Sequence, residues 1–136
     1  SPQMNFIDST LRKIGGRYTV EFGFDQAKGV GTKYYVEVPE AKIDEAVLAP
    51  LVDKDVVMGI RPEDVADTPN GSMSSTVKVY ELLGAEVFLY FDVNGTQITA
   101  RVDPGTKAKT GDPVKFDFDM EKTHFFDKDS ELVITN

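Results

Sequence analysis

The chain has 136 residues, 40% of them hydrophobic, and a formal net charge of −8. This length suits one domain, or one domain with two closely packed lobes. The absence of cysteine and the presence of a single histidine, His124, exclude disulfides, thiolate metal sites and multi-histidine metal sites.

The lysines and arginines are scattered along the chain and form no basic run. An acidic surface without a basic patch repels phosphate backbones and anionic lipid, so we expect no nucleic-acid partner and no direct membrane insertion. No apolar stretch approaches the roughly 20 residues of a membrane span, and the first seven residues lack the segments typical of a signal peptide. We therefore expect a soluble, cytoplasmic protein.

Apolar and polar side chains alternate in the first half of the chain, which predicts half-buried strands at 18–24, 34–38 and 56–60. In the third strand Val57 is apolar on the opposite face, which indicates burial on both sides. Residues 40–51 carry apolar side chains at four-residue spacing and predict a helix, which a proline limits to about two turns.

The polar stretch 67–72 is rich in turn-forming residues and predicts a loop. If it divides the chain, the single domain has two lobes, about 1–66 and 73–136.

Strands follow this loop in quick succession. The alternation predicts strands at 87–93 and 98–102, and Asn94-Gly95 between them is a strong hairpin signal. A turn at 124–127 is expected to lead into a last strand at 132–135. Short strands, tight turns and little helix predict a mostly-β fold, a small barrel or sandwich.

We find no constellation of residues typical of catalysis or cofactor binding. No phosphate-binding loop is present, so these residues are not expected to bind ATP. Asp117, Asp119 and Glu121 alternate with apolar residues, so a strand would point them into solvent rather than around a metal ion. His124 lies near Ser130, but no nucleophile elbow accompanies them. We expect no catalytic, cofactor-binding or metal-binding residue in this chain.

Aromatic residues are more informative. Phe88 and Tyr90 occupy the face of their strand that Glu86 marks as polar. Either a second layer of the same chain covers them, or they belong to a protein interface, where aromatic residues are enriched. Phe125 and Phe126 raise the same question, and adjacent phenylalanines in a turn typically place one in the core and leave the other half exposed.

Five sequence strings carry a resemblance to a known family. They are SPQMNF at 1–6, GIRPEDV at 59–65, VYELLGAE at 79–86, ARV at 100–102 with GDPV at 111–114, and HFFD at 124–127. In this order they resemble the C-terminal domain of ATP-binding subunits in carbohydrate ABC importers of the maltose and multiple-sugar type. The resemblance spans essentially the whole chain.

The resemblance implies an OB-like, TOBE-type regulatory domain over residues 1–136, with the ATPase domain outside this chain. Such a domain holds two ATPase subunits together and receives regulatory proteins, so a homodimer and a regulator are the expected partners. ATP and Mg²⁺ would bind only in the absent ATPase domain, which would also contact the membrane subunits. The expected location is cytoplasmic, at the inner face of the membrane as part of a transporter complex.

The resemblance also indicates candidate interface and regulatory residues. Arg61 and Glu63 match the family's RPE string, where Arg61 pairs with a carboxylate or caps a turn. Gly84 permits a backbone bend beside the aromatic strand. The terminal motif lies near the family's subunit contact, and Phe125 replaces its common leucine. The full candidate set is Arg61, Glu63, Gly84, Glu86, Phe88, Tyr90, His124, Phe125 and Phe126.

Two other functions remain open. TOBE-type domains in some other proteins bind oxyanions such as molybdate, which a charge of −8 disfavours. OB-type folds bind nucleic acid through stacking aromatics in basic grooves, and Phe22, Tyr34 and Tyr35 could stack, but no basic run surrounds them in the sequence. Our leading hypothesis is that the domain pairs through Phe88, Tyr90 or the 124–127 turn.

Overall fold

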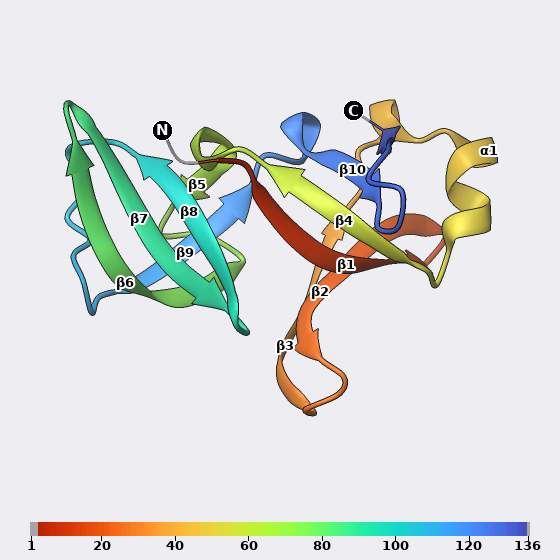
Figure 1. Ribbon diagram of the computed structural model, residues 1–136, viewed down its shortest axis with the longest axis horizontal. Coiled ribbons are helices and arrows are strands. Elements are labelled where there is room, and N and C mark those ends of the chain that lie inside the picture. The colour runs from red at the N-terminus through yellow and green to blue at the C-terminus, as the bar shows by residue number, and fades with distance from the viewer. Residues whose placement is uncertain (1–2, 136) are drawn as a thin grey trace. The chain divides into compact units, whose positions relative to one another are not determined.

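The computed structural model describes residues 3–135, which form two compact units (Figure 1). Unit 1 takes residues 3–5 and 60–119, and unit 2 takes residues 6–59 and 120–135. The polar stretch 67–72 lies inside unit 1, so the units have different bounds from the lobes predicted at 1–66 and 73–136. The reason is that the C-terminal strands return to pair with a strand from the first half of the chain.

Unit 2 is built on a six-stranded sheet with the order β11-β10-β4-β1-β2-β3. Its strands are β1 (Asn5–Ile14), β2 (Arg17–Asp25), β3 (Val30–Glu37), β4 (Asp55–Ile60), β10 (His124–Asp127) and β11 (Val133–Thr135). The pairs β1–β2, β2–β3, β4–β10 and β10–β11 are antiparallel. Side chains at alternate positions, including Ile7, Leu11, Val20 and Met58, are buried in its core.

The predicted helix at 40–51 is divided into three short segments. They are the 3-10 helix η1 (Glu40–Lys42), the α-helix α1 (Glu45–Leu48) and the 3-10 helix η2 (Ala49–Leu51). The Asp44 carboxylate accepts a hydrogen bond from the Ala46 backbone amide at 3.1 Å and so begins α1 as an N-cap. Pro50 lies in the first turn of η2, where a residue without an N–H group is tolerated.

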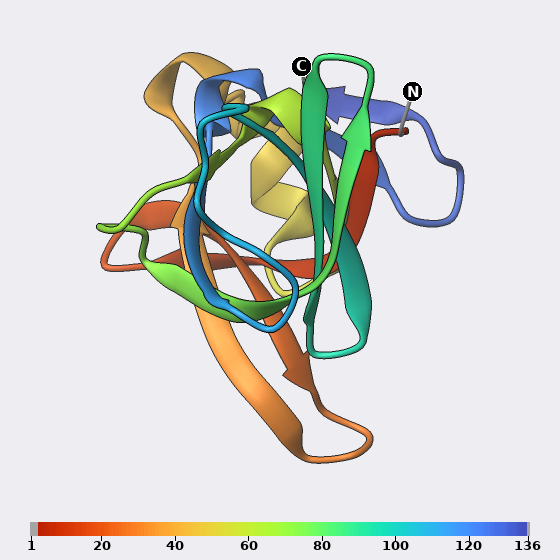
Figure 2. The same ribbon diagram turned by 90° about the vertical axis from the view of Figure 1, so that its left-hand side faces the viewer.

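Unit 1 contains a five-stranded antiparallel sheet with the order β5-β9-β6-β7-β8. Its elements are the 3-10 helix η3 (Pro62–Asp64), β5 (Val65–Asp67), β6 (Met73–Leu83), β7 (Glu86–Val93), β8 (Thr96–Val102) and β9 (Pro113–Phe118); the 3-10 helix η4 (Met120–Lys122) follows in unit 2. Strand β5 also approaches β8, so the sheet curves around a common core (Figure 2). At its centre the Phe91 and Phe116 ring centroids lie 4.7 Å apart.

The mostly-β prediction is confirmed, and two local predictions are wrong. Residues 124–127 form strand β10 rather than a turn, because they pair with β4 over four positions. Strand β1 was not predicted, because its inward positions alternate Asn5, Ile7, Ser9 and Leu11, and the two polar residues hide the apolar pattern. The Asn94-Gly95 hairpin is confirmed, with φ of 48° and 85° at its two turn residues.

In the part of the chain that the structure describes, no helix is both long and apolar enough to cross a membrane.

Candidate interaction surface

Strand β10 orients two adjacent phenylalanines to opposite faces of the sheet. Phe125 pairs with Met58 and is 3% exposed, whereas Phe126 pairs with Val57 and stays partly exposed. Side chains alternate across a strand, so one face of β10 completes the core and the other faces outward. This division of the two rings is the one that the sequence predicted, although a strand rather than a turn produces it.

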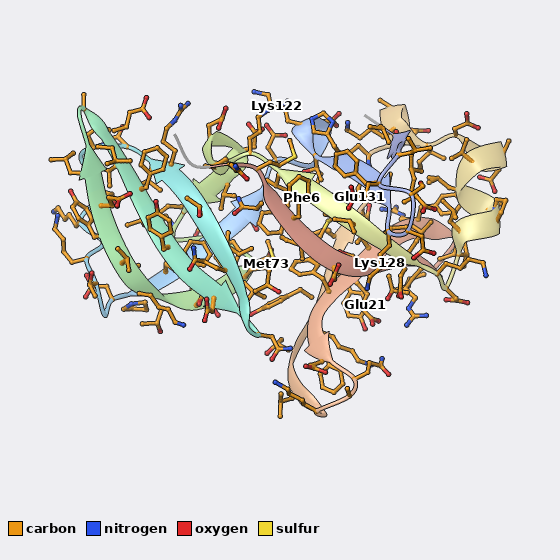
Figure 3. All side chains as sticks on the ribbon, viewed as in Figure 1. Phe6, Glu21, Met73, Lys122, Lys128 and Glu131 are labelled. Carbon is orange, nitrogen blue, oxygen red and sulfur yellow. The ribbon has the colours of Figure 1, made fainter. Side chains whose placement is uncertain are left out.

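The outward face of β10 lines an apolar groove of about 530 Å³ in unit 2, here called the β10 groove. Its lining residues are Phe6, Asp8, Val57, Phe126, Asp127, Lys128 and Glu131. The Phe6 and Phe126 rings meet edge to face, with centroids 5.8 Å apart and planes at 66°. Phe6 is nevertheless 57% exposed, and Figure 3 shows it with Lys128 and Glu131 around this part of the sheet.

The rim of the β10 groove is acidic. The Asp8 carboxylate lies 3.9 Å from the Lys128 ammonium, and Asp127 and Glu131 add two further acids. The Asp127 carboxylate accepts backbone hydrogen bonds from Ser130 at 2.9 Å and Asp129 at 3.0 Å. These hydrogen bonds, that from Ser130 first, hold the pKa of Asp127 below its ordinary value, so this carboxylate stays ionised.

His124 begins β10 opposite Gly59 and is partly exposed. Its ring centroid lies 6.4 Å from that of Phe126, with planes at 43°. His124 and Phe126 are therefore neighbours on β10, and of the two Phe126 lines the β10 groove.

The RPE residues lie at a corner of unit 1. Arg61 occupies the N-cap position of η3, where its backbone carbonyl accepts from the Asp64 amide at 2.9 Å, and its side chain makes no capping hydrogen bond. Pro62 begins η3, where its fixed φ suits the first helical position. Glu63 is exposed and lines a polar groove together with Arg101 and other residues of unit 1.

The third group of predicted residues lies on the β6–β7 hairpin. Gly84 has φ of 62° in its turn, a conformation that favours glycine and confirms the predicted bend. Glu86 lies 3.9 Å from Arg101 on the neighbouring strand β8. Phe88 is 2% exposed, so it is covered within the chain rather than available as a contact.

Tyr90 is only partly exposed. Its hydroxyl donates to the Glu81 carboxylate at 2.8 Å. Burial, followed by this hydrogen bond and the Glu81 charge, raises the pKa of Tyr90. Tyr90 therefore has a polar partner inside unit 1.

The nine predicted residues thus occupy three elements, η3, the β6–β7 hairpin and β10. Sequence reasoning assigned no site role to Phe6, Asp8, Val57, Lys128 and Glu131, which line the β10 groove together with Phe126 and Asp127. The strand that carries Val57 was expected to be buried on both faces, but Val57 is partly exposed and lines the β10 groove. The available signal was Phe6, an aromatic residue between the inward positions Asn5 and Ile7.

Within residues 3–135 no group of three histidine, aspartate or glutamate side chains could hold a metal ion. The predicted row of acids is divided, because β9 ends at Phe118. Asp117 accepts hydrogen bonds from the Ser72 amide at 2.9 Å and the Ser72 hydroxyl at 2.6 Å, while Asp119 and Glu121 follow the strand.

Two family descriptions match the chain in succession. The TOBE domain matches residues 58–126, and the MalK OB fold domain matches residues 1–65. The TOBE match covers more than half of the chain, so the protein belongs to the TOBE domain family. Neither matched description is that of an ATP-hydrolysing domain.

Curated relatives agree with this assignment. The chain is 36% identical over 104 residues to the oligosaccharides import ATP-binding protein MsmX of Bacillus subtilis, covering 71% of this chain and 28% of MsmX. It is 32% identical over 141 residues to the multiple sugar-binding transport ATP-binding protein MsmK of Streptococcus mutans, covering 98% of this chain and 34% of MsmK. The chain thus spans about a third of the length of the curated relatives it matches.

Among solved structures, the chain resembles the cytoplasmic molybdate-binding protein ModG with a TM-score of 0.57. The identity is 17%, and the alignment covers 92% of this chain and 96% of ModG. At this identity the likeness shows a shared fold.

Proposed function

We propose that this chain is the C-terminal regulatory domain of the ATP-binding subunit of a sugar ABC importer. In that role it holds two subunits together and offers a surface to regulatory proteins at the cytoplasmic face of the membrane. The ATPase domain, with its ATP and Mg²⁺, and the contact with the membrane subunits belong to the rest of that subunit.

The observation that supports this role most directly is the β10 groove. Phe6, 57% exposed, and the partly exposed Phe126 form an aromatic pair on the surface of unit 2. Phe126 belongs to the HFFD string, which resembles the terminal HxFD motif of the sugar-importer family. Exposed aromatic pairs beside charged rims are typical of sites that bind protein. We assign the β10 groove to the docking of a regulatory protein, because its floor is apolar and its rim is charged.

A domain replacement tests the proposal. A chimera in which this chain replaces the matching region of B. subtilis MsmX should restore oligosaccharide uptake to cells that lack MsmX. A matched chimera carrying Phe6→Ser and Phe126→Ser should still import sugar but lose regulation that acts through the groove. A chimera that is present in the cell at normal levels and supports no uptake would contradict the assignment.

Oxyanion binding is the second candidate, and the likeness to the molybdate-binding ModG favours it. The charge of −8 opposes it, as does the polar groove of unit 1, where Glu63, Asp67 and Asp103 outnumber Arg101. Calorimetry with molybdate and with sulfate distinguishes the two candidates. We expect no heat of binding from either anion, and saturable heat from molybdate would favour this second function.

A further inference from the structure

Strand β3 is the last strand of the six-stranded sheet in unit 2. Within the described chain its pairing partner is β2 on one side, and Figure 1 shows the β2–β3 hairpin at the end of that sheet. An edge strand presents unpaired backbone N–H and C=O groups, which can accept another strand. Strand β3 contains no proline that would prevent such pairing.

The register shows which residues face this open edge. The Val38 amide donates to the Tyr18 carbonyl at 3.0 Å, and the same register pairs Val36 with Val20. In an antiparallel ladder the hydrogen-bonding groups of successive residues point alternately to the two sides. Tyr34 and Val36 therefore bond to β2, and Tyr35 and Glu37 direct their backbone groups to the open edge. Lys33 lies where the register shifts, between the Phe22–Tyr34 and Phe24–Gly31 pairs.

The side chains of Lys33, Tyr35 and Glu37 are exposed, Tyr35 by 48%, and those of Tyr35 and Glu37 share one face of the sheet. Their present contacts lie on the surface. Glu37 accepts from Arg17 at 3.2 Å, and the Lys33 ammonium lies 5.4 Å from the centre of the Phe24 ring. Exposed contacts of this kind contribute little to stability, so both side chains are available for rearrangement.

We propose that the edge of β3 binds β3 of a second copy of this chain, antiparallel and about a twofold axis at Tyr35. In this register Tyr35 faces its own counterpart, and Lys33 of each copy faces Glu37 of the other. The proposal rests on the proposed function and deepens it, because it names the surface through which the domain holds two subunits together.

Charge complementarity selects this register and this occupant. A shift in one direction until Lys33 faces Lys33, or in the other until Glu37 faces Glu37, places like charges directly opposite, which destabilises a sheet. The Tyr35-centred register instead gives two opposite-charge pairs and one aromatic pair, arrangements that stabilise antiparallel strands. Because the strand is complementary to itself, a second copy is the occupant that fits.

Charge reversal tests the register. Sedimentation equilibrium of the chain should show a dimer. Lys33→Glu and Glu37→Lys should each raise the dissociation constant of this dimer by at least about tenfold, because two attractive pairs become repulsive. The double variant Lys33→Glu/Glu37→Lys should recover the original affinity. Lys54→Glu makes the same change of charge as Lys33→Glu, at an exposed position outside β3, and should leave the affinity unchanged.

A disulfide provides a second test, because the chain has no cysteine of its own. In the proposed register the two Tyr35 Cα atoms lie about 5.5 Å apart, within the range of a disulfide. Tyr35→Cys should therefore form a covalent dimer under mild oxidation, and Leu82→Cys, exposed on unit 1, should not.

The two ways of failing differ in their results. A dimer that persists in all the charge variants, with no disulfide formed by the Tyr35→Cys variant, overturns the β3 edge and leaves pairing of the domain intact. A chain that stays monomeric at every concentration overturns both the β3 edge and the role in holding subunits together.

Discussion

Asn5 links three backbone groups inside unit 1. Its side-chain amide donates to the carbonyls of Ile60 at 3.1 Å and Thr99 at 2.9 Å, and its side-chain oxygen accepts from the Thr99 amide at 2.8 Å. The residue is 6% exposed, so water does not replace these partners. Asn5 therefore has a structural role in the family string at 1–6. The sequence alone did not reveal this role, because the three backbone partners of Asn5 are distant in the chain.

Replacing Asn5 with alanine should lower the free energy of unfolding by about 2 to 3 kcal/mol, because three buried backbone groups lose their partner. Urea denaturation at neutral pH measures this change. Gln3→Ala, an exposed change two residues earlier, is the control and should have little effect. A loss below about 0.5 kcal/mol for Asn5→Ala would show that the three hydrogen bonds contribute no net stability.

Tyr18 should titrate far above an ordinary tyrosine. Its hydroxyl donates to the Glu45 carboxylate at 2.6 Å, and this hydrogen bond, with burial and the Glu45 charge, raises the pKa of Tyr18 from 10.0 to about 12. The folded state favours the protonated phenol, so its contribution to stability is present below pH 10 and is lost as the pH rises through about 12.

Alkaline absorbance titration of the tyrosinates checks this pKa. In the Tyr18→Phe variant, the tyrosine that ionises at the highest pH should be missing from the titration curve. In the Tyr80→Phe variant, which serves as the comparison, that tyrosine should still be present. If Tyr18→Phe instead removes a group that titrates near the ordinary tyrosine value of about 10, the hydrogen bond to Glu45 does not hold in solution.

At the scale of single elements, β10 combines a core face with an outward face that lines the proposed docking groove. Phe125→Ala should cost about 3 to 5 kcal/mol of unfolding free energy, because it removes a buried ring opposite Met58. Phe126→Ala should cost much less, because its ring is partly exposed in the β10 groove. Thermal denaturation of the two variants measures the difference. Equal losses would mean that the outward face of β10 is also part of the core.

Elements with a clean alternation were predictable from sequence, and elements with buried polar residues were not. The strand at 87–93 and its Asn94-Gly95 turn follow from local chemistry alone. Strand β10 was predicted as a turn, because HFFD is short and only its pairing with the distant β4 makes it a strand. Only part of the β10 groove could therefore be predicted. Phe126 belongs to a recognised string, but Phe6 comes near it only because β1 and β10 lie on either side of β4 in the sheet.

For the whole molecule, the sequence strings predicted the family and the alternation of apolar side chains predicted the mostly-β class, and both are confirmed. The bounds of the two units could not be predicted, because unit 2 is assembled from chain segments separated by residues 60–119 of unit 1. The net charge of −8 disfavours contacts with anions. Both proposed surfaces are sites for protein: the acidic rim of the β10 groove suits a partner with basic groups, whereas the β3 edge is proposed to pair through the local complementarity of Lys33 and Glu37.

The central claim is that this domain acts by pairing with a second copy of itself, and sedimentation velocity over a wide concentration range tests it most directly. We predict a reversible shift from monomer to dimer as concentration rises, with no change on adding molybdate. A single monomeric species at every concentration would contradict the claim.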